Sequence, residues 1–363
     1  MTLQERLRET LALPDDDGPY GRALQMLLED ATAAGVSDVH LNPTLDGLEV
    51  LYRRDGVLQA QGLIERARAE RMIGKVKVLA GLLTYRRDVP QDGQIPAADA
   101  GGRSDVRVSL FPTVHGEKAV LRFFLHDEEQ FDLDRLGYSP SVAGGIRAAA
   151  RKPDGVILLT GPSGSGKTTT IYALLREIAR PEGGLRRNVV TIEDPVEHAI
   201  PGITQTQINP AVGLTFAAAL RSLLRQDPQV ILVGEIRDRE TAHVAMEAGL
   251  TGHLVISTIH SGTAAGVAVR LLEMGVEPHV MTASLSCILA QRLARRPSGA
   301  GRQVISELLV MDDDLRRVLA DNPTRARFDE AARSRGMVSL SEDAARLVAS
   351  KRLAPEEATR VLG

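Results

Sequence analysis

Residues 155–170, GVILLTGPSGSGKTTT, constrain the fold of this chain more than any other stretch. They contain the pattern G-x-x-x-x-G-K-[ST], with Gly161, Gly166, Lys167 and Thr168 in its fixed positions. The apolar residues before the pattern predict a buried strand, and TTTIYALLREIA within and after it predicts a helix. A strand, a glycine-rich turn and a helix N-terminus together direct backbone N–H groups and a partial positive charge at phosphate oxygens.

We expect this loop to hold the phosphates of a nucleotide. Lys167 would reach the outer phosphates, and the Thr168 hydroxyl would help to hold Mg²⁺ beside them. The residues expected to bind the nucleotide directly are Gly161, Pro162, Ser163, Gly164, Ser165, Gly166, Lys167, Thr168 and Thr169. What the nucleotide is used for has to follow from the rest of the chain.

Composition narrows the class of protein. A length of 363 residues favours two or three domains. A net charge of -3 and an aromatic content of 3%, with no tryptophan, argue against direct contact with nucleic acid. The single cysteine, Cys287, rules out an intrachain disulfide and a metal site built from several cysteines, and its apolar neighbours SLSCILA predict a buried thiol.

No stretch of the sequence predicts a membrane-inserted segment. The first residues, MTLQERLRETLALP, have charges every few positions and lack the apolar stretch of a signal peptide. No apolar run approaches the roughly 18–20 residues of a membrane-spanning helix. We therefore expect a cytoplasmic protein that reaches a membrane only through partners.

The first part of the chain, residues 20–128, predicts an α+β domain without a catalytic cluster of its own. Its expected helices lie at 20–34 and 65–83, and its expected strands at 37–43, 48–58 and 105–124. Residues 1–19 are expected to form an N-terminal arm, whose short amphipathic helix is either free or docks a partner. Polar, turn-rich residues at 129–140 predict a linker.

Beyond the linker, residues 141–310 predict strands that alternate with helices, which is typical of a parallel sheet covered on both faces. Four apolar runs, VILLT, VVTIED, VILVGEIRD and LVISTIH, each end in polar or charged residues. In such sheets ligands bind beyond the carboxyl ends of the strands, so we expect these polar groups to share an edge with the glycine-rich loop. Residues 311–363 predict a module of short helices.

Acidic residues follow two of these strands. Glu235 ends a buried strand downstream of the loop, where a carboxylate can activate water or join the Mg²⁺ shell through water. The residue before it is Gly234 instead of the more usual aspartate. Glu193, Asp194 and Glu197 follow another strand, and acids beside a triphosphate are tolerated only when Mg²⁺ or water lies between them; a solvated turn is the alternative for these three.

Two histidines flank one strand of the predicted sheet. His260 follows the strand on the expected ligand edge, where it can sense the outer phosphate or reach a neighbouring subunit. His253 precedes the strand, and a structural role is as plausible for it as a functional one. Metal binding by this pair is not expected, because no third ligand follows at a suitable spacing.

Arginines form two further groups of candidates. Arg221 and Arg225 lie four residues apart on one predicted helix, where they could neutralise developing negative charge or simply form exposed ion pairs. Arg107 and Arg122 lie on strand-like runs of the first domain, and the same two alternatives apply to them.

Read together, these stretches resemble the secretion ATPases of the type II secretion and type IV pilus superfamily, in its secretion, pilus-extension and DNA-uptake branch. The resemblance runs from about Ser37 to the C-terminus. It rests on SDVH, RRDG, KVKVLAGLLTYRRDVPQDGQI, DVRVSLFPTVHGEKAVLR, GPSGSGKTTT, TIEDPVEH, GLTFAAALRSLLRQDPQVILVGEIRD, TGHLVISTIH and AQRL, all in family order. A match of this length is far more specific than the phosphate loop alone.

The resemblance implies an N-terminal α+β domain of PAS-like type followed by a RecA-like P-loop ATPase domain. It implies a homohexamer with ATP between the two domains of the subunit and Mg²⁺ as cofactor. Loop 161–169 would be Walker A, 191–198 an Asp box, Glu235 the Walker B carboxylate and 251–260 a His box. The positions that match the arginines completing the family's nucleotide site, partly across subunits, are Arg107, Arg122, Arg221 and Arg225.

Two departures from the family pattern affect what we expect. Many members bind zinc with two CxxC pairs in a C-terminal insert, but AQRLARRPSGAGRQVISELL passes through that region without cysteine, so no zinc is expected. Residues 1–19 are too short to replace the N-terminal domain by which some members dock to a membrane protein. The pilus-retraction branch is the alternative, and the presence of DVRVS and GEKAVLR without an AIRNLIRE-like helix favours the extension and secretion branch.

The sequence therefore predicts a hexameric motor that hydrolyses ATP to ADP and phosphate. Glu235 would activate water, with Glu193 assisting, and the first domain would swing on a hinge at 126–140. The family implies that an inner-membrane platform protein, with a membrane adaptor as a further candidate, receives this motion and assembles pilin-like subunits at the inner face of the cytoplasmic membrane. Alternatives of other classes are a low-turnover nucleotide-binding scaffold and a DNA-translocating motor.

Overall fold

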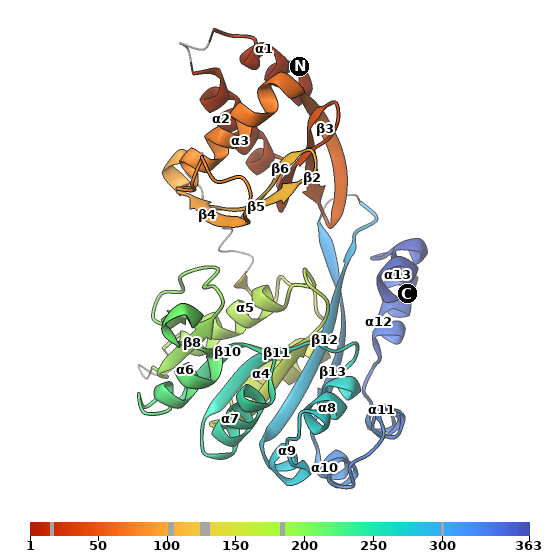
Figure 1. The fold of residues 1–363 in the computed structure, drawn as a ribbon. Coiled ribbons are helices and arrows are strands. Elements are labelled where there is room, and N and C mark those ends of the chain that lie inside the picture. Colours follow the sequence, from red (N-terminus) through yellow and green to blue (C-terminus); the bar gives the residue numbers. More distant parts are fainter. Residues whose placement is uncertain (15–17, 101–104, 124–130, 182–185, 299–300) are drawn as a thin grey trace. The chain divides into compact units, whose positions relative to one another are not determined.

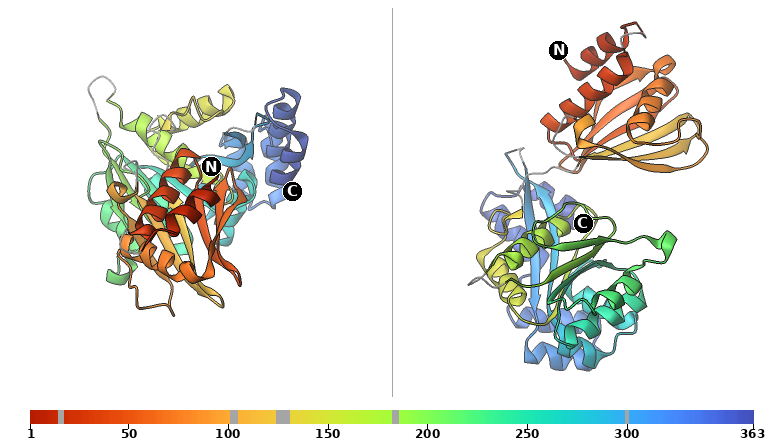
Figure 2. Two further views of the ribbon diagram at one scale, coloured as in Figure 1. Left: turned by 90° about the horizontal axis from the view of Figure 1, so that it is seen from above. Right: turned by 90° about the vertical axis from the view of Figure 1, so that its left-hand side faces the viewer.

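The structure of the chain, a computed structural model, describes residues 1–14, 18–100, 105–123, 131–181, 186–298 and 301–363. Its contacts divide the chain into two units, Met1–Asp127 and Glu128–Gly363, each built around a sheet with hydrophobic residues of its own (Figures 1 and 2). The fold class expected from the sequence, α+β followed by a P-loop α/β domain with a helical end, is confirmed.

An antiparallel sheet in the order β3-β2-β1-β6-β5-β4 forms the first unit. Its strands are β1 (Asp38–Pro43), β2 (Gly47–Arg54), β3 (Val57–Glu65), β4 (Gln91–Ile95), β5 (Val106–Thr113) and β6 (Gly116–Phe123). Three helices pack together with this sheet: α1 (Leu3–Leu11), α2 (Pro19–Ala33) and α3 (Arg66–Leu79). The core between them is built from aliphatic residues such as Leu24, Leu27 and Val76, all fully buried.

Helix α1 belongs to this core. Leu3, Leu7 and Leu11 recur at helical spacing and are buried against α2 and β3. The Gln4 side chain accepts a hydrogen bond from Leu63 N at 2.5 Å and donates one to Leu63 O at 3.1 Å, so it pairs with the open edge of β3 as a neighbouring strand would. The alternative of a free N-terminal arm is therefore wrong for α1.

The second unit contains a seven-stranded sheet in the order β13-β12-β7-β11-β10-β8-β9. Its strands are β7 (Gly155–Thr160), β8 (Val189–Glu193), β9 (Thr204–Gln207), β10 (Val230–Ile236), β11 (Leu254–Ile259), β12 (Leu285–Arg295) and β13 (Arg302–Val310). All neighbouring pairs are parallel except β12 with β13. The carboxyl ends of β7, β8, β10 and β11 consequently lie along one edge.

Helices cover both faces of this sheet (Figure 1). Val156 and Leu158 of β7 face one hydrophobic cluster, and Ile157 and Leu159 face the other. The first cluster includes α6 (Phe216–Leu223), α7 (Arg239–Leu250), α8 (Ala264–Glu273) and α9 (Pro278–Ser284); the second includes α4 (Pro140–Ala150) and α5 (Lys167–Ala179). Because β7 is buried on both faces, it has no polar side chain before Thr160 at its end.

The long hairpin of β12 and β13 was not expected as a pair of strands. Cys287 in β12 is fully buried, which raises the pKa of its thiol to about 12. The expected helical module follows as α10 (Asp313–Ala320), α11 (Arg325–Ser334), α12 (Leu340–Ala349) and α13 (Pro355–Leu362).

The expected hinge and linker lie partly outside the described residues, namely at 126–130. From residue 131 the chain forms turns until Ser139 caps α4 through a bond from Val142 N. None of the described helices is long and apolar enough to cross a membrane.

A buried ion pair ties α3 to β6 in the first unit. The Lys77 Nζ atom lies 2.5 Å from Glu117 Oε1 and also donates to Arg86 O at 2.6 Å, and the lysine is 1% exposed. Replacing Lys77 by methionine leaves the Glu117 carboxylate buried without its partner, so we expect the first unit to lose about 3–5 kcal/mol of unfolding free energy. Hydrogen exchange of peptides from α3 and β6 would measure this loss.

Lys75 on the same helix is the matched control, because its half-buried side chain has no such acid partner among the described residues. Lys75→Met should change the unfolding free energy by less than about 0.5 kcal/mol. The double variant Lys77→Met/Glu117→Gln should recover part of the loss, and a loss as large as that of the single variant would contradict the ion-pair explanation.

Candidate functional site

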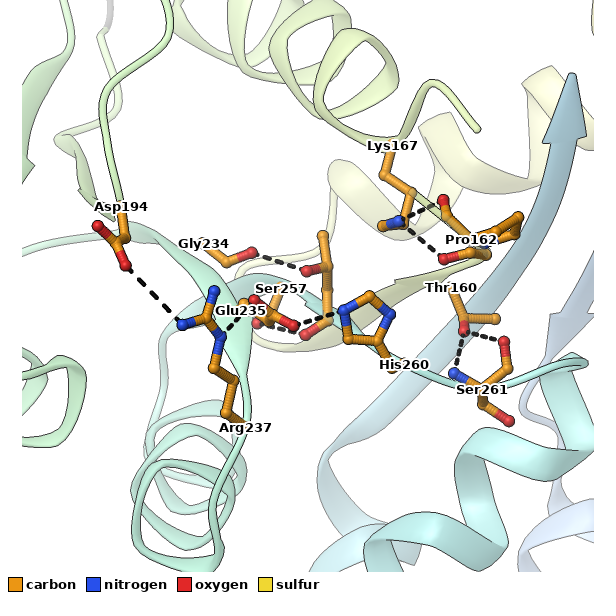
Figure 3. Close-up of polar contacts among 12 residues, drawn as sticks. Thr160, Pro162, Lys167, Asp194, Gly234, Glu235, Arg237, Ser257, His260 and Ser261 are labelled. Atoms are coloured by element: carbon orange, nitrogen blue, oxygen red, sulfur yellow. Dashed lines mark hydrogen bonds and ion pairs between the residues drawn. The ribbon is translucent and has the colours of Figure 1, made fainter. Parts of the chain in front are cut away.

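The glycine-rich loop joins β7 to α5 at the carboxyl edge of the sheet. Gly166 caps α5 with φ +87°, a left-handed conformation that side chains disfavour. The Lys167 Nζ atom donates to Gly161 O at 2.8 Å and to Pro162 O at 3.0 Å (Figure 3). Burial lowers the pKa of Lys167, while the negative charge of Glu235 acts in the opposite direction. The ammonium is thus held by neutral carbonyls within the electrostatic reach of an acid.

Glu235 stands at the centre of a chain of ionisable groups along this edge (Figure 3). Its Oε1 atom lies 2.8 Å from His260 Nε2, and its Oε2 atom accepts a hydrogen bond from Arg237 Nε at 2.6 Å. Arg237 Nη1 lies 3.9 Å from Asp194 Oδ2. The ends of β8, β10 and β11 therefore bring Asp194, Glu235 and His260 together, as their order in the sheet requires. Glu235 is mostly buried, whereas His260 is largely exposed.

Side-chain hydroxyls hold the end of β10 in place. The register between β10 and β11 shifts between Val233 and Ile236. Over this irregular stretch Ser257 Oγ donates to Val233 O at 2.7 Å. Thr258 Oγ1 donates to Gly234 O at 2.8 Å (Figure 3). These bonds give the backbone carbonyls next to Glu235 side-chain donors from the neighbouring strand.

A second pair of bonds joins the strand of the loop to the segment after His260. Thr160 Oγ1 donates to Ser261 O at 2.9 Å and accepts from Ser261 N at 2.9 Å (Figure 3). Sequence reasoning missed Thr160, Ser257, Thr258 and Ser261. The available signal was the hydroxyl residues inside apolar strands, because a buried hydroxyl needs a partner close by.

Glu193 lies in a different network. Its Oε2 atom accepts from Tyr172 Oη at 2.5 Å, and its Oε1 atom accepts from Thr191 Oγ1 at 2.6 Å and Gln205 Nε2 at 3.1 Å. Burial and the charge of Glu193 raise the pKa of Tyr172 well above its usual value, so the phenol stays a donor. Glu193 is only 4% exposed and its partner Tyr172 is buried as well, which does not favour the assisting role in water activation expected from the sequence.

Two further candidates also lie apart from the Glu235 group. His253 stands at the opposite end of β11, where its carbonyl accepts from Gly155 N at 3.1 Å and its Nδ1 atom lies 3.2 Å from Ala248 O. These contacts support the structural alternative for His253. The backbone of Glu197 donates to Tyr172 Oη at 3.2 Å, which places this residue beside the Glu193 network.

The four candidate arginines occupy two places. In the second unit, Arg221 pairs with Glu240 at 2.6 Å, and Arg225 donates to Arg221 O at 3.0 Å and to Ser222 Oγ at 3.2 Å. In the first unit, Arg107 and Arg122 face each other across β5 and β6. Arg122 Nε donates to the buried Asp38 at 2.9 Å, while more than half of the Arg122 side chain remains exposed.

Among the described residues, no group of three or more His, Cys, Asp or Glu side chains is arranged to hold a metal ion. At the loop, the exposed Thr168 hydroxyl on the first turn of α5 is a protein oxygen that a metal ion bound to a nucleotide could use. A magnesium ion held mainly by phosphates and water fits such a sparse protein contribution.

Comparison with known proteins confirms the resemblance. Residues 14–360 match the sequence model of a family described as Type II/IV secretion system protein. The chain is 39% identical to type II secretion system protein HxcR of Pseudomonas aeruginosa, and the alignment covers 95% of this chain and 78% of that protein. It is 45% identical to type II secretion system ATPase E of Vibrio cholerae (79% and 56% covered) and 38% identical to type IV pilus assembly ATPase PilB of Thermus thermophilus (90% and 41% covered). The chain thus spans about half the length of the latter two proteins.

Solved structures agree on the fold. The pilus retraction motor PilT, with bound ADP, aligns with a TM-score of 0.70 at 26% identity, over 93% of this chain and 96% of that one. The ATPase DotB of Legionella pneumophila aligns with a TM-score of 0.75 at 22% identity, over 92% and 94%. At this identity the DotB match shows the fold alone.

The close approach of β8 and β10 explains the glycine before Glu235. A Cβ atom at Gly234 would lie 3.2 Å from Ile192 O and 3.4 Å from Glu193 Cα. Gly234→Ala should therefore push the two strands apart and lower the unfolding free energy of the second unit by about 1–3 kcal/mol. Urea unfolding followed by circular dichroism would measure the shift.

Gly144 in α4 provides the matched control, since nothing lies within 4 Å of the position of its Cβ. Gly144→Ala should be neutral or stabilise by up to about 1 kcal/mol, because alanine favours the helix. Equal urea midpoints for the two alanine variants would show that the contact at Gly234 is not restrictive.

Proposed function

Because this chain belongs to the Type II/IV secretion system protein family, we propose that it binds Mg-ATP at residues 161–169 and hydrolyses it to ADP and phosphate. The observation that carries the proposal is the meeting of Lys167, Glu235 and His260 at one edge of the parallel sheet. A phosphate-binding loop and a potential general base are the two parts that hydrolysis of a phosphoanhydride needs most.

The loop would bind the phosphates through its backbone N–H groups and the N-terminus of α5. Lys167 would exchange the carbonyls of Gly161 and Pro162 for phosphate oxygens, which bind an ammonium more strongly because they carry charge. Thr168 would contribute its hydroxyl to a magnesium ion, and the positive charge of that ion would offset the negative charge of the phosphates.

Glu235 would accept a proton from water as the water oxygen attacks the terminal phosphorus and the bond to ADP breaks. The proton then passes from the carboxylate to phosphate or solvent, so that Glu235 is regenerated. His260 and Arg237 engage both carboxylate oxygens in the structure, so one of these contacts has to give way to the water. Both partners are largely exposed, with 66% of the His260 side chain and 60% of the Arg237 side chain accessible, so either can move aside without losing a buried contact.

The arginines would complete the site, as the family resemblance implies. Arg221 has an exposed partner, Glu240, and could exchange it for phosphate at little cost because both groups remain solvated. Arg122 and Arg107 of the first unit would add positive charge, partly across subunits of a homohexamer. Asp38 would keep Arg122 oriented in the meantime.

The work done by hydrolysis would be the assembly of pilin-like subunits through an inner-membrane platform protein, with a membrane adaptor as a further partner. The names of the relatives in Pseudomonas, Vibrio and Thermus refer to type II secretion and type IV pilus assembly and support a role in such a machine. The platform protein and the adaptor are implied by the family resemblance. The protein would then act in the cytoplasm, at the inner face of the cytoplasmic membrane, and movement of the first unit about the segment at 126–140 would transmit the motion. A pilus-retraction motor is the second candidate, because the retraction motor PilT shares the fold. It comes second because the identity to PilT is lower than the identity to the secretion and pilus-assembly relatives.

Steady-state hydrolysis of Mg-ATP by the full chain, with Lys167→Ala beside it, tests the proposed activity. We expect turnover by the wild type and a loss of about 100-fold or more in Lys167→Ala, with an unchanged circular dichroism spectrum. Lys152→Ala, a surface lysine of the same unit, is the control and should keep full activity.

Each other outcome is informative. Nucleotide binding without turnover in the wild type would favour the scaffold alternative. A Lys167→Ala protein that is unfolded would mean that the lysine acts through its bonds to Gly161 and Pro162 in the loop itself.

A further inference from the structure

A buried glutamine, Gln291, contacts both ends of the phosphate loop. It lies in β12 directly after Ala290, which pairs with Thr160 at the end of β7. Its side chain is 1% exposed, and its Nε2 atom donates to Ser165 O at 2.6 Å. Its backbone oxygen lies so near the start of the loop that a Cβ at Gly161 would come within 2.4 Å of it.

Ser165 O fixes the orientation of the Gln291 amide, and Tyr138 holds its other end. A carbonyl can only accept, so the Gln291 nitrogen must face Ser165 O and the oxygen Oε1 must face the other way. There it accepts from Tyr138 Oη at 3.0 Å, and the same phenol oxygen lies 2.8 Å from Thr170 Oγ1 on the first turn of α5. The amide thus has one arrangement that satisfies all of its neighbours.

The bond to Ser165 O sets the direction of a whole peptide group. The peptide between Ser165 and Gly166 is planar and trans, so its N–H points opposite to its C=O. With the carbonyl held against Gln291, the Gly166 N–H is directed away from β12. Gly166 has a positive φ and no side chain, so without this bond the peptide could turn over at little steric cost. A turned peptide would present a carbonyl oxygen where the loop should present a donor to phosphate.

We propose that Gln291 is a positioning residue that locks the Ser165–Gly166 peptide in the orientation that binds phosphate, with Tyr138 holding the amide in turn. This inference rests on the proposed nucleotide site. If only a fraction of the molecules has the competent loop, the apparent dissociation constant rises by the inverse of that fraction. Once bound, the nucleotide itself holds the loop, so turnover at saturation should depend much less on Gln291.

The test compares Gln291→Glu with the wild type in the full chain. Glutamate keeps the shape and can still accept from Tyr138, but an ionised carboxylate cannot donate to Ser165 O. We expect the dissociation constant for a fluorescent ATP analogue with Mg²⁺ to rise about tenfold, as the loss of one buried hydrogen bond predicts. The kcat at saturation should fall by less than about threefold. Gln291→Met, which is apolar and of similar length, should have the same effect.

Gln303 is the matched control. It is also 1% exposed, lies in the partner strand β13, and donates through Nε2 to Gly137 O at 3.1 Å and not to the loop. Gln303→Glu should leave the dissociation constant within about twofold of the wild-type value. Equal increases in Gln303→Glu and Gln291→Glu would overturn the proposal, because packing of the segment around Tyr138 would then explain both.

Hydrogen exchange without nucleotide separates this proposal from the proposed function. The Ser165 N–H bonds to Pro162 O at 3.2 Å within the loop, and its exchange should become faster in Gln291→Glu when the lock is lost. A wild type that binds no nucleotide would contradict the proposed function, yet faster exchange would still support the lock. An unchanged exchange rate in Gln291→Glu would refute the lock. So would an unchanged nucleotide affinity in Gln291→Glu when the wild type binds nucleotide.

Discussion

Burial of the parallel sheet on both faces is the constraint from which the rest of the second unit follows. Alternate residues of β7 enter two different hydrophobic clusters, so no polar side chain can be accommodated along the strand before Thr160. The same holds for most of β8, β10 and β11. Polar chemistry is therefore confined to the strand ends, and parallel pairing places those ends along one edge. The grouping of Lys167, Glu235 and His260 is a consequence of this arrangement.

The buried hydroxyls are the apparent exceptions, and each of them has a partner. Thr160, Ser257 and Thr258 bond to backbone groups of neighbouring segments. Ser257 and Thr258 join β11 to β10 where the ladder becomes irregular near Glu235, and Thr160 joins the end of β7 to Ser261. In the proposed mechanism this matters because a general base has to be held to within a fraction of an ångström of the attacked atom. The site is thus positioned by strands and hydroxyls, and the loop by Gln291.

Much of the fold could be predicted from the sequence because its strongest signals are local. The glycine pattern of the loop, the apolar runs of β7, β8, β10 and β11, and the capped helices are all readable in short windows. The β12–β13 hairpin was missed because SLSCILAQRLAR follows α9 without a glycine or proline to mark the start of a strand. The packing of α1 was left open because a short amphipathic helix does not show what covers its leucines, and one of its two partners, β3, is distant in the sequence. Glu193 was grouped with Glu235 because both were predicted at strand ends. The hydrogen bonds that hold Glu193 in a separate network come from Tyr172 in α5 and Gln205 in β9, and the prediction of strand ends does not reveal these partners.

The proposed mechanism assigns Glu235 to the chemical step and not to nucleotide binding. Single-turnover hydrolysis and nucleotide binding, both measured for Glu235→Gln in the full chain, test it most directly, with the exposed Glu247→Gln of α7 as control. We expect a dissociation constant for Mg-ATP within about threefold of the wild-type value and a single-turnover rate lower by about 100-fold or more, since a glutamine cannot accept the proton. A single-turnover rate like that of the wild type, or a loss explained by weaker binding alone, would contradict it.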